Sequence, residues 1–308
     1  MTQSAHLHLG AHKTATTSFQ RLLAVNAKRL REEFGVVNVR SQQFHAFEAY
    51  RLISHARAGR DIEDAAVESA RAQLASEIGG RGLSVILSHE GLIGQHNLNT
   101  DGGMYPGVGA ATAVIARVFA DFRTSVSFVI RAQPAFLEST YMQAAHYGNF
   151  LPFDEYVSGI DLASMSWRRV VTAMREAFGD DRVEVMPFEA IKAGERTFFA
   201  DLLRPLLGER TDEFMSTARL DNDGKQNASL SQTALTILER THGTLGREDL
   251  RTLIAFMRTA FSNQTHPRAK PCPPRLRRQL LDYFGPENAA LFAELDRRYA
   301  EHVRHYQP

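Results

Sequence analysis

A short run near the N-terminus combines small residues, one lysine and several hydroxyl side chains, which together can bind an anion. The run is Gly10-Ala11-His12-Lys13-Thr14-Ala15-Thr16-Thr17, and it follows a strand-like segment and precedes a helical pattern. A helix start presents free backbone N–H groups and the positive end of the helix dipole. Lys13 adds a charge, and the threonines add donors. We predict a phosphate or phosphosulfate loop; the alternative is that Thr16 or Thr17 only caps the helix and that Lys13 is solvated.

A second pair of residues has the chemistry of a phosphate clamp. Arg131 ends a strand-like run, and Ser139 follows eight positions later in a helical pattern. A guanidinium fork at a strand end and a hydroxyl on the next helix can converge on one phosphate. Taken alone, Arg131 could form a surface ion pair and Ser139 could be an ordinary helix residue.

The first run does not fit the Walker A pattern, because no glycine precedes Lys13. It resembles the 5′-phosphosulfate loop of sulfotransferases that use 3′-phosphoadenosine-5′-phosphosulfate (PAPS), commonly G-x-x-K-T-G-T-T-x-L-Q. Ala15 stands where that family usually has glycine, so a positive φ is disfavoured there. Arg131 and Ser139 match the family's 3′-phosphate contacts. The bacterial, carbohydrate-type members show R-x-Q and then S-x-Y-x-Q, as this chain does at Arg131, Gln133, Ser139, Tyr141 and Gln143.

This resemblance spans Leu7 to about Ser231 and implies transfer of a sulfuryl group from PAPS to an acceptor hydroxyl or amine, leaving 3′,5′-adenosine bisphosphate. The acceptor is expected to be a carbohydrate or a small metabolite. Lys13 would stabilise the leaving phosphate, and Glu90, or else His89, would be the base. Neighbouring strand residues point to opposite faces, so only one of the two should face the sulfur. The other possibility for Glu90 is a structural ion pair.

Two weaker parallels extend the resemblance. Phe188 follows a strand in an element that approaches the adenine in relatives, although it could equally be a core aromatic. The segment Asn227–Ser231 resembles an Asn-x-Ser stretch of bacterial members, and helix capping by Ser229 or Ser231 is the simpler interpretation.

Two other functions remain open on the sequence. A P-loop kinase would use the apolar run Leu83–Glu90 as a strand ending in an acidic residue that holds Mg²⁺, but it leaves Arg131 and Ser139 without a role. A catalytically silent nucleotide-binding protein would keep both motifs without turnover.

Two other groups of titratable residues have simpler interpretations. His6 and His8 share a strand face, but the sequence offers no third ligand, and we predict no metal. A basic run near the C-terminus could meet an anionic nucleotide or acceptor, and a solvated helix face is the simpler interpretation. Its members are Arg268, Lys270, Arg275, Arg277 and Arg278.

The elements that must position these residues alternate between strand and helix. Strand-like runs are Ala5–Leu9, Leu83–Leu87, Ser125–Ile130 and a weaker Arg182–Pro187, and one helical pattern runs from Phe19 to Phe34. Alternation predicts an α/β fold, a P-loop-like three-layer domain with a central parallel sheet flanked by helices. We predict one domain, with an α/β core over 1–228 and a mainly helical portion over 229–308. Gly91–Thr112 is predicted to be a long loop.

Composition limits the remaining classes. The chain has 308 residues and a formal charge of +1, which gives no bulk attraction to nucleic acid or to an anionic membrane. Cys272 is the one cysteine, no run reaches the ~20 apolar residues of a membrane span, and the first strand-like run leaves no room for a signal peptide. These features predict a cytoplasmic protein without a membrane span. They do not indicate an oligomeric state.

Overall fold

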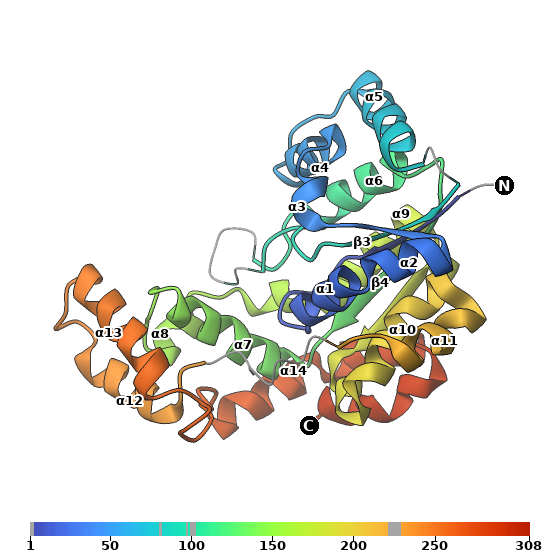
Figure 1. Ribbon diagram of the computed structural model, residues 1–308. Coiled ribbons are helices and arrows are strands. Elements are labelled where there is room, and N and C mark those ends of the chain that lie inside the picture. The colour runs from blue at the N-terminus through green and yellow to red at the C-terminus, as the bar shows by residue number, and fades with distance from the viewer. Residues whose placement is uncertain (1–2, 80–81, 97, 99–102, 221–228) are drawn as a thin grey trace.

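The structure of the chain, a computed structural model, describes residues 3–79, 82–96, 98, 103–220 and 229–308 (Figure 1). Its centre is one fully parallel sheet with the strand order β2-β3-β1-β4-β5. The strands are β1 (Ser4–His8), β2 (Val36–Val39), β3 (Ser84–Ser88), β4 (Arg123–Ile130) and β5 (Val183–Pro187). Four of them confirm the predicted strand-like runs to within two residues.

Helices cover both faces of the sheet, so the predicted α/β, P-loop-like three-layer fold is confirmed. One face packs in a hydrophobic cluster with α1 (Thr16–Val25), α2 (Ala27–Phe34), α10 (Glu195–Leu207), α11 (Thr211–Thr217) and the 3₁₀ segment η6 (Arg297–His305). The other face packs with α4 (Glu48–Arg57), α5 (Asp64–Leu74), α6 (Val108–Val118) and α9 (Trp167–Phe178). Shorter elements connect these layers: α3 (Ser41–Phe44), η1 (Ala75–Gly79), α8 (Phe153–Ser158), η2 (Leu162–Met165), η3 (Asp180–Arg182), η4 (Phe188–Ala193) and η5 (Gly208–Arg210).

Three local predictions were wrong or incomplete. The first helical pattern is broken at Asn26, whose backbone leaves the helical conformation (φ −105°, ψ 9°) and whose side-chain amide donates to the carbonyls of Leu22 and Arg219. The edge strand β2 was missed, although Gly35 in the left-handed region (φ 66°) followed by valines is the signal of a helix end and a strand start. The loop predicted over 91–112 ends at Gly107, because α6 already begins at Val108.

The C-terminal portion is mainly helical, as predicted, and has two parts (Figure 1). The helices α12 (Gln232–Thr241) and α13 (Arg247–Ala260) lie away from the sheet, where α13 packs on α7 (Gln133–His146). The helix α14 (Pro274–Ala293) packs on α7 and α9, and η6 packs beside β5. One hydrophobic cluster continues from the sheet to Tyr306, while the domain division at residue 228 stays a prediction. None of the helices in the described part of the chain is long and apolar enough to cross a membrane.

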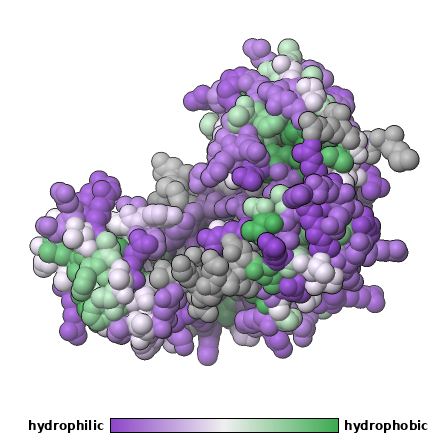
Figure 2. Space-filling model, in the orientation of Figure 1, coloured by the Kyte–Doolittle hydropathy of each residue, from purple (hydrophilic) through white to green (hydrophobic). Residues whose placement is uncertain are grey.

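The strand order fixes where a ligand can be bound. β1 lies in the middle, with the carboxyl ends of β3 and β4 on either side of it, and the chain adds later strands on both sides of β1. Open parallel sheets bind ligands at such a switch in strand order, beyond the carboxyl ends. The outline of the molecule is notched between the α3–α5 region and the α12–α13 end, and the surface beside the notch is mostly hydrophilic (Figure 2).

Candidate functional site

The turn after β1 is built around Gly10. Its backbone continues the pairing with β4, since the Val129 N–H donates to the Gly10 carbonyl at 2.7 Å and the Ala11 N–H donates to the Val129 carbonyl at 2.8 Å. Gly10 has φ +105°, and a Cβ added there would lie 2.9 Å from the Cβ of Glu90. Only glycine fits this close approach between the loop and the end of β3.

The start of α1 is open to an anion. The cap residue is Ala15, with no side-chain cap, so neither Thr16 nor Thr17 has the simple capping role. The first N–H to bond back to this cap is that of Phe19, to the Ala15 carbonyl at 3.0 Å. The N–H groups of the preceding helical residues therefore have no intrahelical acceptor. This geometry can bind one phosphate or sulfate group.

The loop adopts the left-handed region without the glycine usual in the resembling family. Ala15 has φ 63° and Lys13 has φ 64°. The sequence expectation that alanine disfavours a positive φ at this position is thus overridden by the surrounding structure. Such a conformation costs about 1–2 kcal/mol for a residue with a Cβ.

Two of the hydroxyl groups predicted to bind the anion instead form hydrogen bonds within the loop. Thr14 and Thr16 are buried, and their hydroxyls donate to the Ala11 carbonyl at 2.6 and 3.3 Å. Thr17 is exposed at the helix start. The buried pair therefore holds the loop in shape, and the backbone and Lys13 are left to bind an anion.

Lys13, Arg131 and Ser139 all line one cavity of about 1030 Å³. Burial, and then the nearby Arg131, hold the pKa of Lys13 below its ordinary value. Both effects disfavour the charged amine, and a bound anion would offset them. The sequence motifs are thus brought together by β1, β4 and α7, although they are more than a hundred residues apart in the chain.

Arg131 is held from several sides. It donates to the Lys13 carbonyl at 2.8 Å, and its guanidinium carbon lies 4.9 Å from the centre of the Phe188 ring. Its Nε is buried without a partner among the described residues. Phe188 therefore lies beside the predicted clamp, where a base could stack, and it also packs edge-on against the core residue Phe198.

Side chains from the end of the chain and from the segment after β5 support this strand end. Glu189 accepts the Ala132 N–H at 3.2 Å and the Tyr306 hydroxyl at 2.7 Å. Gln133 exchanges a side-chain bond with Asn288 at 3.0 Å. The C-terminal segment thus fixes the position of Arg131 from behind.

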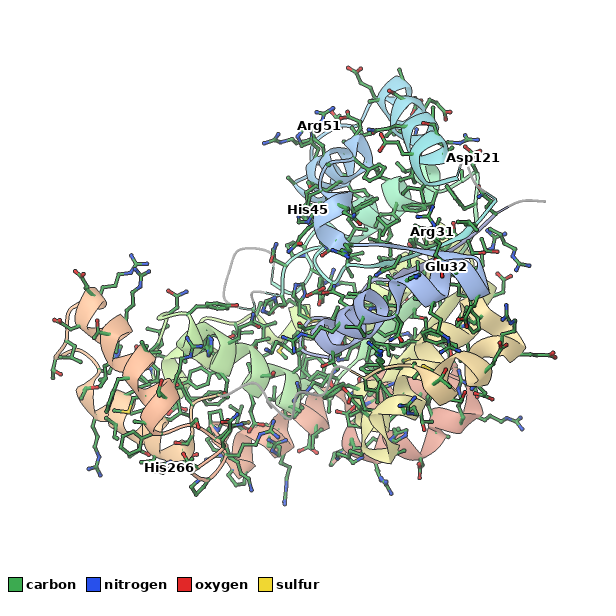
Figure 3. The ribbon with its side chains drawn as sticks, viewed as in Figure 1. Arg31, Glu32, His45, Arg51, Asp121 and His266 are labelled. Atoms are coloured by element: carbon green, nitrogen blue, oxygen red, sulfur yellow. The ribbon has the colours of Figure 1, made fainter. Side chains whose placement is uncertain are left out.

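The two candidate bases at the end of β3 point to different sides, as the alternation of a strand predicts. Glu90 lies against Gly10 and accepts the Gln20 side-chain amide at 3.0 Å. His89 lies on the other side, where its Nε2 is 3.0 Å from Nε2 of His45, a residue labelled in Figure 3 at the α3 end of the molecule. Burial, and then His45, lower the pKa of His89 to about 4. Glu90 is the one beside the anion loop.

The cavity runs along one face of α7 and is strongly basic. Its described lining contains a single carboxylate, Glu138, which is paired with Arg277 at 2.8 Å. The cationic lining residues are Lys13, Arg131, Arg258, Arg268, Lys270 and Arg277. Three members of the predicted basic run therefore face the cavity, whereas Arg275 and Arg278 do not line it. Arg258 was missed because nothing in its local sequence marks it.

The segment around Ser229 is only partly described. Asn227 and Ala228 lie outside the described residues. Ser229 lines the cavity, and Ser231 caps α12 by accepting the Ala234 N–H at 3.1 Å. The capping interpretation is therefore confirmed for Ser231.

Two stacked imidazoles lie at the anion loop. Nδ1 of His12 is 2.9 Å from the Tyr105 hydroxyl oxygen, and the His12 ring stacks on the His96 ring with 4.2 Å between the ring centres. Burial, and then His96, lower the pKa of His12 to about 2. Nε2 of His96 is 3.1 Å from Oε1 of Gln143. Sequence reasoning missed His96 and Tyr105, since both come from the long loop.

His6 and His8 lie buried on one face of β1, as predicted. His6 bonds Ser125 at 2.9 Å and Ser127 at 3.1 Å, and His8 bonds Ser88 at 2.8 Å. Within the part of the chain that the structure describes, no group of three or more His, Cys, Asp or Glu residues could hold a metal ion.

Comparisons with known proteins give weak similarities. No protein-family model matches this sequence, and no curated protein is significantly similar to it. A sulfotransferase from Alicyclobacillus acidocaldarius is structurally similar with a TM-score of 0.46 and 13% identity, over 98% of this chain and 100% of that one. A gluconokinase from Sinorhizobium meliloti 1021 is similar with a TM-score of 0.31 and 14% identity, over 66% and 93%. These values are below the level at which a shared activity follows.

Proposed function

We propose that this chain is a sulfotransferase that binds PAPS and transfers its sulfuryl group to an acceptor hydroxyl or amine. The observation that supports this most is that Lys13, from the loop before α1, lines one basic cavity together with Arg131 and Ser139. A donor with a 5′-phosphosulfate and a 3′-phosphate needs two anion sites. The loop at Lys13 would bind the 5′-phosphosulfate, and the Arg131–Ser139 clamp would bind the 3′-phosphate. Phe188 would lie against the adenine.

The reaction needs little beyond positioning and charge. Lys13 and the free N–H groups of α1 stabilise the charge that develops on the 5′-phosphate as its oxygen–sulfur bond breaks. The acceptor oxygen or nitrogen attacks the sulfur in line, a new bond to sulfur forms, and Glu90 accepts the acceptor's proton. The products are the sulfated acceptor and 3′,5′-adenosine bisphosphate.

A transfer assay tests the proposal. The wild-type protein is incubated with PAPS carrying radioactive sulfur and a mixture of carbohydrate and small-metabolite acceptors. We expect label in an acceptor fraction, and Glu90→Gln should lower the rate by about 10²–10⁴ without changing bisphosphate affinity, because it removes only the base. His89→Gln is the matched control and should retain most activity. Loss of activity in His89→Gln with full activity in Glu90→Gln would move the base to His89.

A further inference from the structure

A second cavity of about 540 Å³ opens beside the first one. The two share Gln143 and Tyr147, so they meet at the end of α7. Tyr147 is 66% exposed at this junction. The second cavity also contains the side chains of His96 and Asn149, and it is thus connected to the anion loop through the His12–His96 stack.

This second cavity has a mixed polar and apolar lining and is nearly uncharged. Its described lining contains no carboxylate and one guanidinium, that of Arg247. Burial, and to a smaller extent the nearby Lys13, hold the pKa of His96 below its ordinary value. An exposed tyrosine ring surrounded by amide and hydroxyl groups can stack on the apolar face of a sugar and bond its hydroxyls.

Arg247 is the first of three arginines on one side of α13. Arg247, Arg251 and Arg258 fall within about 40° of one another around the helix, and they span about 16 Å along it. Arg251 packs against Gly148: a Cβ added to Gly148 would lie 2.7 Å from the Cγ of Arg251. Arg258 lines the first cavity. Arg247 therefore lines the second cavity and Arg258 lines the first, with Arg251 between them on the helix.

These arginines have no counter-charge among the described residues. All three are exposed, and none forms an ion pair with a carboxylate of the described residues. Arg247 is moreover the first residue of α13, where the helix dipole disfavours a cation. A row of exposed guanidinium groups without a described ion-pair partner, beside a sugar-compatible cavity, can bind an anionic ligand, and carboxylates suit the guanidinium fork.

We propose that the second cavity is the acceptor site and that the acceptor is an acidic oligosaccharide, with uronate carboxylates paired to the α13 arginines. Its reacting sugar would lie at Tyr147 and Gln143, next to the sulfuryl group bound at Lys13. This inference rests on the proposed function, since it names the acceptor of the same reaction. A span of three arginines requires more than one sugar ring.

Binding of matched oligosaccharides tests the inference. The probes are tetragalacturonate and its fully methyl-esterified form, which has the same chain without charge, each titrated in the presence of saturating adenosine 3′,5′-bisphosphate. We expect the wild-type protein to bind the acid at least about tenfold more tightly, as one charge-assisted pair would give. The double variant Arg247→Gln/Arg251→Gln should lose most of that preference and keep its bisphosphate affinity.

Arg240→Gln is the matched control, because Arg240 is an exposed arginine of α12 outside both cavities. It should behave like the wild type. Equal binding of acid and ester, failure of the acid to bind, or a preference that survives in the double variant would overturn the inference. The bisphosphate is titrated first and alone, so absence of its binding would refute the proposed function, whereas bisphosphate binding without an acid preference refutes only the acceptor assignment.

Discussion

Arg131 offers the sharpest separation of ligand binding from fold support. It contacts the Lys13 carbonyl at 2.8 Å, and its Nε is buried without a described partner. If this donor and its neighbours bind the 3′-phosphate, Arg131→Ala removes a charge-assisted interaction of about 1.5–3 kcal/mol. The dissociation constant for adenosine 3′,5′-bisphosphate should then rise roughly 10–150-fold.

The same substitution also loosens the Lys13 loop, so a second ligand is needed. AMP has the 5′-phosphate but no 3′-phosphate, and its affinity should report only the loop contact. A contact of about 0.5–1.5 kcal/mol would weaken AMP binding by roughly 2–13-fold. The bisphosphate loses the clamp as well as the loop contact, so its affinity should fall by more than that of AMP. Isothermal titration calorimetry of both nucleotides with both proteins gives the comparison.

Arg123→Ala is the control for that experiment, since Arg123 is exposed at the opposite end of β4. It should leave both affinities near wild type. Equal weakening of AMP and the bisphosphate in Arg131→Ala would refute the clamp and leave Arg131 with a structural role. An unchanged affinity for both would refute the placement of the nucleotide in this cavity.

Two further predictions concern stability. Ala15→Gly should raise the melting temperature by roughly 2 °C, because it relieves about 1 kcal/mol at φ 63°; a lower melting temperature would contradict that backbone conformation. Burial lowers the pKa of His6 to about 4 and of His8 to about 3, below the ordinary 6.5, so the unfolded chain takes up these protons first. Above pH 7 the stability should not depend on this pair. From pH 6.5 towards pH 4 the free energy of unfolding should fall by about 1.4 kcal/mol per pH unit for each histidine. A melting temperature that stays constant between pH 7 and 5 would contradict the buried, neutral state of the two histidines.

The sequence predicted what depends on local pattern. The loop from Gly10 to Thr17 could be identified because a strand, a turn and a helix start are adjacent in the chain. Arg131 and Ser139 could be paired with each other because a strand end and one helix connect them. The alternation of a strand predicted that Glu90 and His89 point apart.

What the sequence could not provide is the packing of distant segments. Arg258 and Arg247 reach the cavities only because α13 lies on α7, more than a hundred residues away. Tyr306 supports Glu189 from the end of the chain, and no local pattern indicates that contact. Ala15 was expected to resist a positive φ, yet the buried bonds of Thr14 and Thr16 to Ala11 hold the turn in place.

The central claim is that one cavity binds a nucleotide through both a 5′- and a 3′-phosphate. Calorimetric titration of the wild-type protein with adenosine 3′,5′-bisphosphate and, separately, with ATP and Mg²⁺ tests it most directly. We predict that the bisphosphate binds at least about tenfold more tightly, since only it uses the Arg131–Ser139 clamp. Tighter binding of ATP with Mg²⁺ would favour a kinase and contradict the account, and so would the absence of bisphosphate binding.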